Sequence, residues 1–245
     1  MVGCSKKKED LDDLQIIKKR GYLIVGVKND SPPFGFYNEK GELVGFDIDI
    51  AYAIAERIFD EKSPANVKFV VVSPQNRISK LNSKEVDILV ATMSINEKRK
   101  LVLDFSMPYF VVSQKLLIRN TSKIPNLHYF NKEGRLAVIM GTTGERIARK
   151  VAPNANLIGA KGYDEAYKLL INQKVDAILG DDCILTRFVN DKTKLVSHAY
   201  SKEFYAVAIR KTEKSKVLLN SVNSAIAMIL DEKKLNLITK KWIMY

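Results

Sequence analysis

"VDILVATMSINEKRKLVLDFSMPYF", residues 86–110, joins an apolar run to hydroxyl side chains and then to a group of charges. Its first residues have the length and the β-branched content of a buried strand. Thr92 and Ser94 follow that run, and Arg99 lies among the four charged residues 97–100. Ligands of open α/β sheets bind beyond the carboxyl ends of the strands. The stretch therefore predicts a strand that brings these three side chains to a binding site.

The segments on either side of this stretch alternate between predicted strands and helices. Residues 22–27 and 67–73 are predicted as strands, and residues 44–59 as a helix with Ile50, Ile54 and Ile58 on one face. "ISKLNSKEVDILVA" is repeated about ninety residues later as "YKLLINQKVDAILG". Such alternation is typical of α/β lobes with mostly parallel sheets, and the weak repeat predicts two of them.

Two extended runs, residues 113–122 and 204–212, look like crossings between the lobes, and the helical pair predicted over 216–243 would return the chain to the first lobe. We expect a flexible tether at 1–14, a first lobe from 15–113 with 208–245, and a second lobe at 114–207. Two crossings predict a two-strand hinge and a cleft that closes on a small ligand.

The composition restricts the possible partners. The chain has 245 residues and a net charge of +12, which raises the question of nucleic-acid binding. The basic residues are spread singly, however, and no zinc-finger spacing or RNA-binding motif organises them, so we expect no nucleic-acid partner. No apolar run reaches the length of a membrane span. We also expect no cofactor, no metal and no catalytic residue.

Cys4 is the more informative of two cysteines, because it follows a small residue and precedes a charged stretch. This pattern resembles the end of a bacterial lipobox after removal of a signal peptide, which would make Cys4 a lipid anchor at a membrane surface. A terminus without function is the alternative.

The residues that follow the predicted strands share one chemistry. Hydroxyls, free N–H groups and a guanidinium bind a carboxylate, and a lone carboxylate opposite them suits an ammonium. An α-amino acid satisfies both. Each residue also has an ordinary interpretation, as a solvated charge, a helix cap or core. The candidates are Lys28, Phe34, Phe36, Arg77, Thr92, Ser94, Arg99, Thr142, Thr143 and Asp181.

In order along the chain, "GVKNDSPPFGF", "GELVGFDIDIAYAIAERI", the opening stretch and "GTTGE" with "VDAILGDD" resemble the family 3 solute-binding proteins of bacterial ABC transporters for polar amino acids. The resemblance covers about residues 18–242. It implies the two-lobe periplasmic-binding-protein type II fold, of class α/β with mixed sheets. It departs from the family pattern at Lys98, which stands between the usual acid and Arg99.

The resemblance also implies roles for the candidates. Arg99 would hold the ligand α-carboxylate and Asp181 the α-ammonium. Thr92 and Ser94 would add backbone or hydroxyl contacts, the turn at residues 142–143 would donate to the same carboxylate, and Phe34 or Phe36 would form an aromatic wall.

The choice of ligand side chain depends on Lys28 and Arg77, which occupy places where family members that bind basic amino acids resemble one another in carrying acids. Asp30 is expected to turn away into the proline turn. Two cations favour glutamate or aspartate first, and glutamine or cysteine next. Arg77 could equally serve the structure.

The resemblance implies a monomeric protein of the periplasm or cell surface that delivers a free amino acid to an ABC permease and its ATPase. Two alternatives stay open at this point. One is a cyclohexadienyl dehydratase-like enzyme, although His128 and His198 lie away from the strand ends. The other is a sensor or adhesin domain.

Overall fold

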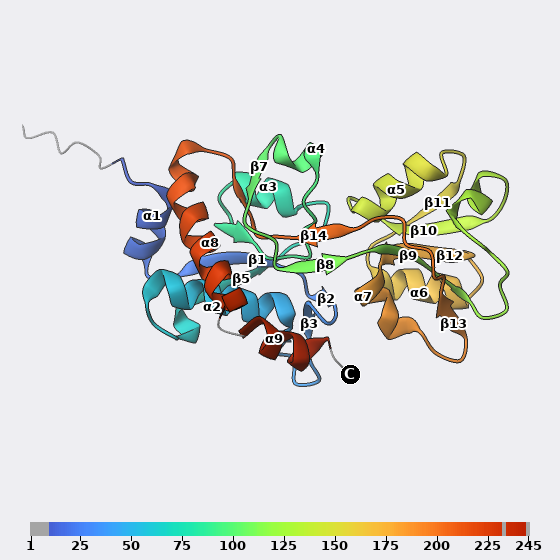
Figure 1. The fold of residues 1–245 in the computed structure, drawn as a ribbon, viewed down its shortest axis with the longest axis horizontal. Coiled ribbons are helices and arrows are strands. Elements are labelled where there is room, and N and C mark those ends of the chain that lie inside the picture. The colour runs from blue at the N-terminus through green and yellow to red at the C-terminus, as the bar shows by residue number, and fades with distance from the viewer. Residues whose placement is uncertain (1–9, 232–233, 244–245) are drawn as a thin grey trace, which may run out of the picture.

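The computed structural model describes residues 10–231 and 234–243, and it contains two five-stranded sheets that lie side by side (Figure 1). Cys4, the predicted lipid anchor, lies outside the described residues. We call the part built on the first sheet lobe 1 and the part built on the second sheet lobe 2. The exact boundaries predicted from the sequence, at 113/114 and 207/208, stay predictions.

The sheet of lobe 1 is mixed. In it β1 pairs in parallel with β5 and β6, whereas β15 pairs antiparallel with β6 and β7. The order across the sheet is β5 (Val67–Val71), β1 (Leu23–Val27), β6 (Ile88–Leu89), β15 (Ala208–Arg210) and β7 (Leu103–Phe105). A small antiparallel sheet beside it is made of β2 (Asp30–Ser31), β3 (Gly35–Tyr37) and β4 (Leu43–Val44).

The sheet of lobe 2 follows a similar plan. Its central strand β10 pairs in parallel with β11 and β12, and β9 pairs antiparallel with β12 and β13. The order is β11 (Asn156–Ala160), β10 (Arg135–Ile139), β12 (Ala177–Asp181), β9 (Gln114–Arg119) and β13 (Thr193–Leu195). Both sheets are mixed, so the structure has the two-lobe α/β fold with mixed sheets that the sequence predicted.

Two short strands connect the lobes. Strand β8 (Phe110–Val112) pairs antiparallel with β14 (Glu203–Tyr205), and both lie between the two sheets in Figure 1. They lead directly into β9 of lobe 2 and β15 of lobe 1, respectively. Of the two extended runs noted in the sequence, residues 204–212 overlap β14, whereas residues 113–122 begin just after β8 and coincide with β9.

Helices cover the faces of both sheets. The apolar face predicted for α2 is buried, with Ile50, Ile54 and Ile58 at most 1% exposed, and α8 packs on α2. In lobe 1 the helices are α1 (Asp13–Arg20), α2 (Phe46–Phe59), α3 (Arg77–Asn82), α4 (Glu97–Lys100), α8 (Lys216–Asp231) and α9 (Lys234–Trp242). In lobe 2 they are α5 (Thr143–Val151), α6 (Tyr163–Ile171) and α7 (Asp182–Leu185).

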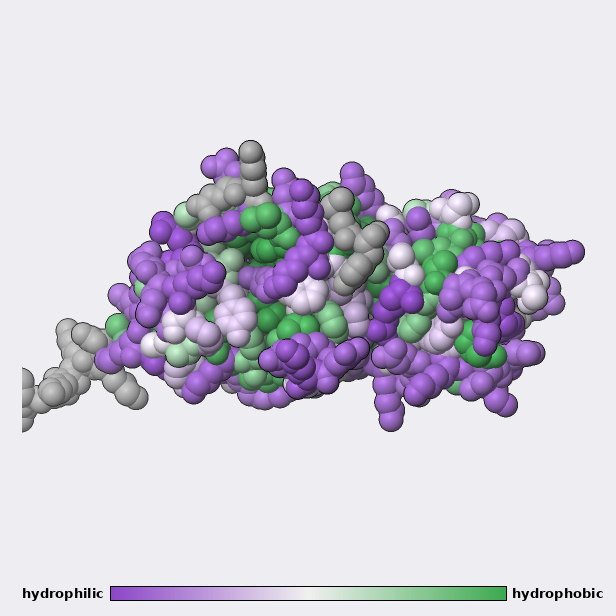
Figure 2. Space-filling model, turned by 90° about the horizontal axis from the view of Figure 1, so that it is seen from below, coloured by the Kyte–Doolittle hydropathy of each residue, from purple (hydrophilic) through white to green (hydrophobic). Residues whose placement is uncertain are grey.

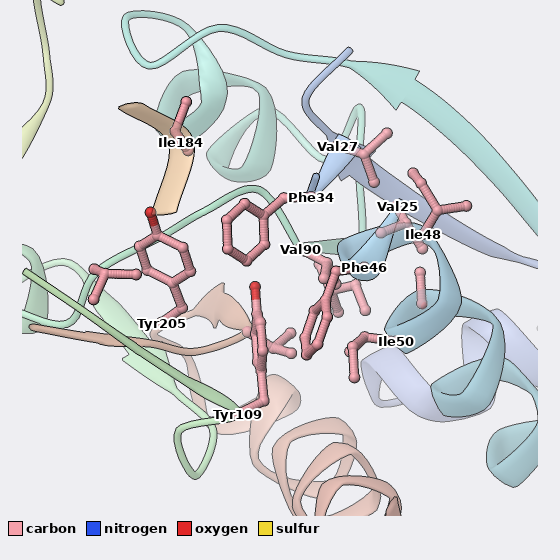
Figure 3. Packing of buried hydrophobic residues seen from close by; sticks show 14 of the residues in the cluster. Val25, Val27, Phe34, Phe46, Ile48, Ile50, Val90, Tyr109, Ile184 and Tyr205 are labelled. Atoms are coloured by element: carbon pink, nitrogen blue, oxygen red, sulfur yellow. The ribbon is translucent and has the colours of Figure 1, made fainter. Parts of the chain in front are cut away.

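The core of lobe 1 continues to the connecting strands through a group of aromatic rings. Phe34 packs edge-on against Phe46, Phe110 and Tyr205, with ring centroids 5.1–5.8 Å apart. Figure 3 shows Phe34, Phe46, Tyr109 and Tyr205 gathered at this point. Because offset and edge-on ring pairs bury large apolar areas, they fix the base of the connecting strands against lobe 1.

Hydrophilic side chains cover most of the face seen in Figure 2, on both lobes, with apolar side chains in scattered patches. None of the helices in residues 10–231 and 234–243 is long and apolar enough to cross a membrane.

Candidate functional site

A small cavity lies between the lobes at the carboxyl ends of their strands. Eight of the ten candidate residues line it. Lobe 1 contributes Lys28, Asp30, Ser31, Pro74, Arg77, Thr92, Ser94 and Arg99, and lobe 2 contributes Ile139, Thr142, Thr143, Gly162, Tyr163 and Asp181.

Arg99 faces the cavity from the short helix α4. Its backbone N–H donates to the N-cap side chain of Asn96 at 2.9 Å, which starts the helix and fixes the direction of the arginine. Its Nη1 donates to the Ser94 carbonyl at 2.6 Å, and the residue is 9% exposed. Lys98 and Lys100, by contrast, are exposed. Of these three cations, only Arg99 is in place to hold an anion inside the cavity.

Arg77 is the second buried guanidinium of lobe 1. Its Nη1 donates to the Ala91 carbonyl at 2.7 Å and to the Thr92 carbonyl at 3.5 Å. Its Nε is buried and has no hydrogen-bond partner among the described residues. Burial, followed by the charge of Arg99, lowers the pKa of Arg77 to about 9. Arg77 therefore supports the Thr92 backbone and also presents a poorly compensated cation to the cavity.

Lys28 is 5% exposed and forms an ion pair with Asp30, with Nζ and Oδ1 2.8 Å apart. The expectation that Asp30 turns away is wrong, because Asp30 lines the cavity. Its Oδ2 lies against Gly162 of the opposite lobe, where a Cβ atom would stand only 2.9 Å away. Lys28 is thus a cation whose charge is already partly balanced.

The hydroxyl hydrogens of Thr142 and Thr143, at the start of α5, are both already used in hydrogen bonds. Thr142 Oγ1 donates to the Ile139 carbonyl at 2.6 Å, and Thr143 Oγ1 donates to Glu203 Oε2 at 2.7 Å. The backbone N–H groups in the first turn of a helix have no partner within the helix. At this turn an anion would therefore be bound by main-chain N–H groups, helped by the helix dipole, rather than by the hydroxyls.

Asp181 ends strand β12 and is 7% exposed. Its Oδ1 accepts from Gln114 Nε2 at 2.6 Å, and its Oδ2 accepts from the Tyr163 hydroxyl at 3.4 Å. Burial, followed by the charge of Glu203, raises the pKa of Asp181 to about 7. A ligand ammonium at this point would stabilise the ionised carboxylate.

Phe34 and Phe36 do not line the cavity. Phe34 is fully buried in the aromatic group at the connecting strands, and Phe36 packs against Trp242 of α9 at a centroid distance of 5.8 Å. The aromatic side chain that lines the cavity is Tyr163, from lobe 2.

The sequence reasoning missed several lining residues. Tyr163 and Gly162 follow strand β11, so the rule applied to the other strand ends would have found them there too. Asp30 and Ser31 belong to a two-residue strand in a turn-rich stretch, which has no periodic signal. Gln114 was also missed; it lies behind the cavity wall rather than in it, and nothing in its local sequence marks it.

The two lobes touch each other beside the cavity. Gln75 Nε2 donates to the Met140 carbonyl at 2.8 Å, and Arg99 Nη2 donates to the Gly141 carbonyl at 3.4 Å. A Cβ atom on Gly141 would stand 3.0 Å from the Pro74 carbonyl oxygen. The structure is therefore a closed arrangement in which side chains of lobe 1 bond the backbone of lobe 2 across the cleft.

Residues 23–245 match the model of the bacterial extracellular solute-binding proteins, family 3. The chain belongs to this family. The relatives are solute-binding proteins rather than enzymes, in agreement with the expectation for this chain, and the family's description as extracellular implies a periplasmic location. Membership also implies an amino acid ligand and an ABC transporter as partner, as the resemblance indicated.

Individual family members are similar along most of the chain. The ABC transporter glutamine-binding protein GlnH of Bacillus subtilis is 33% identical and covers 98% of this chain and 88% of its own length. A glutamine-binding protein of Geobacillus stearothermophilus is 37% identical, with 88% of each chain covered. The solved cysteine-binding protein of Campylobacter jejuni is 28% identical, with a TM-score of 0.88 over 94% of this chain and 92% of its own.

Proposed function

We propose that this family 3 protein captures a polar L-amino acid between its lobes, an acidic one by preference, and presents it to an ABC permease. The observation that carries the preference is the charge of the cavity. Three cationic side chains and two carboxylates line it, namely Lys28, Arg77, Arg99, Asp30 and Asp181. A zwitterion adds no net charge, whereas a second carboxylate on the ligand balances the excess cation.

Each charged group of such a ligand would meet a matching group of the cavity. The α-carboxylate would bind the Arg99 guanidinium and the free N–H groups at the start of α5, and the α-ammonium would bind Asp181. Thr92 and Ser94 line the cavity from the same lobe as Arg99. The side-chain carboxylate would then lie toward Lys28 and Arg77, the two remaining cations.

Glutamine is the second candidate. The Lys28–Asp30 ion pair reduces the positive charge that the ligand side chain meets, which favours a neutral amide over a carboxylate. The glutamine-binding relatives support the same choice. An amide can accept from Lys28 and donate to Asp30, so the pair would satisfy both ends of it.

Closure of the cleft would couple binding to delivery. A ligand that contacts both lobes is bound in full only when they meet, so it shifts the population toward the closed form. The permease and its ATPase would then receive a monomer in this form. We further propose that lipid on Cys4 holds the protein at a membrane surface, and that the lobes divide at the boundaries predicted from the sequence.

A thermal-shift screen of the purified protein against the twenty amino acids tests this function. A ligand present at 100 times its dissociation constant stabilises the folded state by about 2.7 kcal/mol. We expect glutamate or aspartate to give the largest shift and glutamine the next. No shift with any of the twenty would contradict the proposal, and turnover of arogenate or prephenate would favour the dehydratase alternative instead.

Lys98, the neighbour of Arg99, provides a matched control for the proposed role of Arg99 in binding the ligand carboxylate. We expect Arg99→Ala to weaken amino acid binding by about 2–5 kcal/mol in calorimetry, because a buried carboxylate loses its charged partner. Lys98→Ala removes an exposed cation one residue away and should leave the affinity nearly unchanged. Equal affinities for the Arg99→Ala variant and the wild type would rule this role out.

A further inference from the structure

Gln114, the first residue of β9, lies behind the cavity wall and is 1% exposed. Its Nε2 donates to Asp181 Oδ1 at 2.6 Å and lies 3.3 Å from Thr143 Oγ1, to which it also donates. Asp181 and Thr143 both line the cavity, whereas Gln114 does not. One buried amide therefore connects the proposed ammonium site with the turn at the proposed carboxylate site.

These hydrogen bonds form a chain from Asp181 to Glu203, and the acceptors at its two ends fix the direction of each bond. Thr143 Oγ1 accepts from Gln114 and donates to Glu203 Oε2 at 2.7 Å, and Glu203 Oε1 accepts from Ser201 at 3.0 Å. Glu203 pairs with Val112 in the ladder between the lobes. Because the Glu203 carboxylate and the ionised Asp181 carboxylate accept and do not donate, the glutamine amide donates to both of its neighbours.

The other end of the Gln114 side chain has no hydrogen-bond partner among the described residues. Its Oε1 is buried, and a Cβ atom on Gly144 would come within 2.8 Å of it. A buried acceptor without a donor is unfavourable. The flipped amide would be worse, since Oε1 would then face the carboxylate of Asp181. The fold thus leaves the carbonyl unpaired and directs the N–H groups at the site.

Charged and titratable groups face Asp181 from several elements. The burial of the carboxyl and the negative charges on Glu203 and Asp182 disfavour its ionised form, whereas the Tyr205 hydroxyl on β14 and the charge of Arg77 on the opposite lobe favour that form. Within lobe 2, the uncharged N–H donor with the shortest distance to this carboxylate is Gln114. The remaining neighbours are Tyr163 on α6, Cys183 on α7 and Arg99 on α4.

We propose that Gln114 is a positioning residue for amino acid capture, which keeps Asp181 ionised and aimed at the ligand ammonium while it fixes the side chain of Thr143. The inference rests on the proposed function in one respect, namely that Asp181 receives the ammonium. It acts through Asp181 and Thr143, and Gln114 itself does not touch the ligand.

Two variants of the full chain test this role. Gln114→Met keeps the approximate shape and removes the donor, and Gln114→Asn keeps an amide but shortens it by one methylene. Thr193→Val is the matched control, because Thr193 is a fully buried residue of lobe 2 whose hydroxyl bonds the Phe188 carbonyl. The titration of the Asp181 carboxyl group is followed by NMR, through the signal of its carboxyl carbon, in the ligand-free protein. Calorimetry between pH 6 and pH 8.5 gives the dissociation constant of the amino acid that binds most tightly.

In Gln114→Met we expect the titration midpoint of Asp181 to rise by about one pH unit, because a hydrogen bond to the charged form is lost. The dissociation constant should rise about tenfold at pH 6.5, with a smaller ratio to wild type at pH 8.5, where Asp181 ionises in both proteins. Gln114→Asn should shift both quantities in the same direction by less. Thr193→Val should lower the melting temperature and change neither quantity.

An unchanged Asp181 midpoint in both variants, or a loss of affinity that is equal at every pH, would overturn the role of Gln114 even if the wild type binds its amino acid. Absence of amino acid binding by the wild type would instead overturn the proposed function, and the NMR titration would still report whether Gln114 controls Asp181.

Discussion

The backbone N–H of Thr92 donates to Oδ2 of Asp47 at 2.8 Å and holds a cavity residue in a left-handed conformation, with φ at +46°. A β-branched residue adopts this conformation only when its surroundings impose it. Asp47 is fully buried in the first turn of α2, and its Oδ1 accepts from the Tyr109 hydroxyl at 2.9 Å. On the other side of Thr92, its carbonyl oxygen accepts from Arg77 Nη1.

Removal of Asp47 should therefore affect both stability and binding. We expect Asp47→Ala to lower the free energy of unfolding by about 2–4 kcal/mol, because two buried donors lose their acceptor. The amino acid affinity should also fall as Thr92 relaxes. Asp49→Ala on the same helix is the control, since Asp49 pairs with the exposed Lys241 and the half-buried Trp242, and this variant should lose about 1 kcal/mol or less of stability. Urea unfolding curves of the three proteins check this.

The ligand-free protein should become less stable as the pH rises from about 4 to about 7. Burial raises the pKa of Asp47 to about 6 and that of Asp181 to about 7, so the folded state binds more protons than the unfolded state in this window. Stability then falls with pH, with a slope that approaches about 1.4 kcal/mol per unit for each group. Unfolding curves at pH 4.5 and 7.5 measure this, and Asp181→Asn should flatten the slope. A stability that rises over this range would contradict both pKa shifts.

Amino acid binding should show the opposite pH dependence. The ligand ammonium needs an ionised Asp181, so affinity should fall by up to about tenfold per unit as the pH drops below 7. Binding near pH 6.5 should release a proton. Calorimetry in two buffers of different ionisation enthalpy counts that proton, and identical heats in both buffers would contradict the assignment.

Gly141 should be important for closure. Its φ is +79°, and a Cβ atom there would stand 3.0 Å from the Pro74 carbonyl oxygen of the opposite lobe. We expect Gly141→Ala to weaken binding of every amino acid ligand by a similar factor, because it strains the turn and obstructs the closed form. Gly21→Ala is a control for backbone strain alone, since Gly21 also has a positive φ but has no atom within 4 Å of the added Cβ. A Gly141→Ala variant that binds amino acids as tightly as the wild type would show that the lobes need not meet at this residue.

The N-terminal helix should be held to lobe 1 by one buried network. Arg210 Nη2 and the Ser215 hydroxyl both donate to Asp13 Oδ2, at 3.0 Å and 2.6 Å. Arg210 would be left as an uncompensated buried charge in Asp13→Ala, which should lower the free energy of unfolding by about 3–5 kcal/mol. Lys216→Ala breaks an exposed ion pair with Glu213 and should change it by less than about 1 kcal/mol. Similar losses in both variants would argue against the network.

The sequence predicted the parts of the site that depend on strand ends. Hydrophobic runs locate a strand to within a few residues, and the residues after it must reach the same edge of a sheet. That reasoning predicts that Thr92, Ser94, Arg99 and Asp181 lie together, and all four line the cavity. The two-lobe fold followed from the repeated alternation of strands and helices.

The parts that the sequence did not predict depend on contacts between distant segments. Whether Phe34 faces the cavity or the core depends on how the connecting strands pack, which no local pattern encodes. The direction of the Thr143 hydroxyl depends on Glu203, sixty residues away, and the role of Gln114 depends on Asp181, sixty-seven residues away. Hydrogen-bond direction requires both partners, so these features were visible only in the structure.

The hydrogen bond from Gln75 to the Met140 carbonyl acts on every ligand alike, because neither group lines the cavity. It changes how often the empty protein is closed, and the apparent dissociation constant of each ligand is scaled by that fraction. Sensitivity and discrimination are therefore separate quantities in this molecule. Changes at the rim of the cleft would adjust how dilute a nutrient the cell can collect, without altering which nutrient it collects.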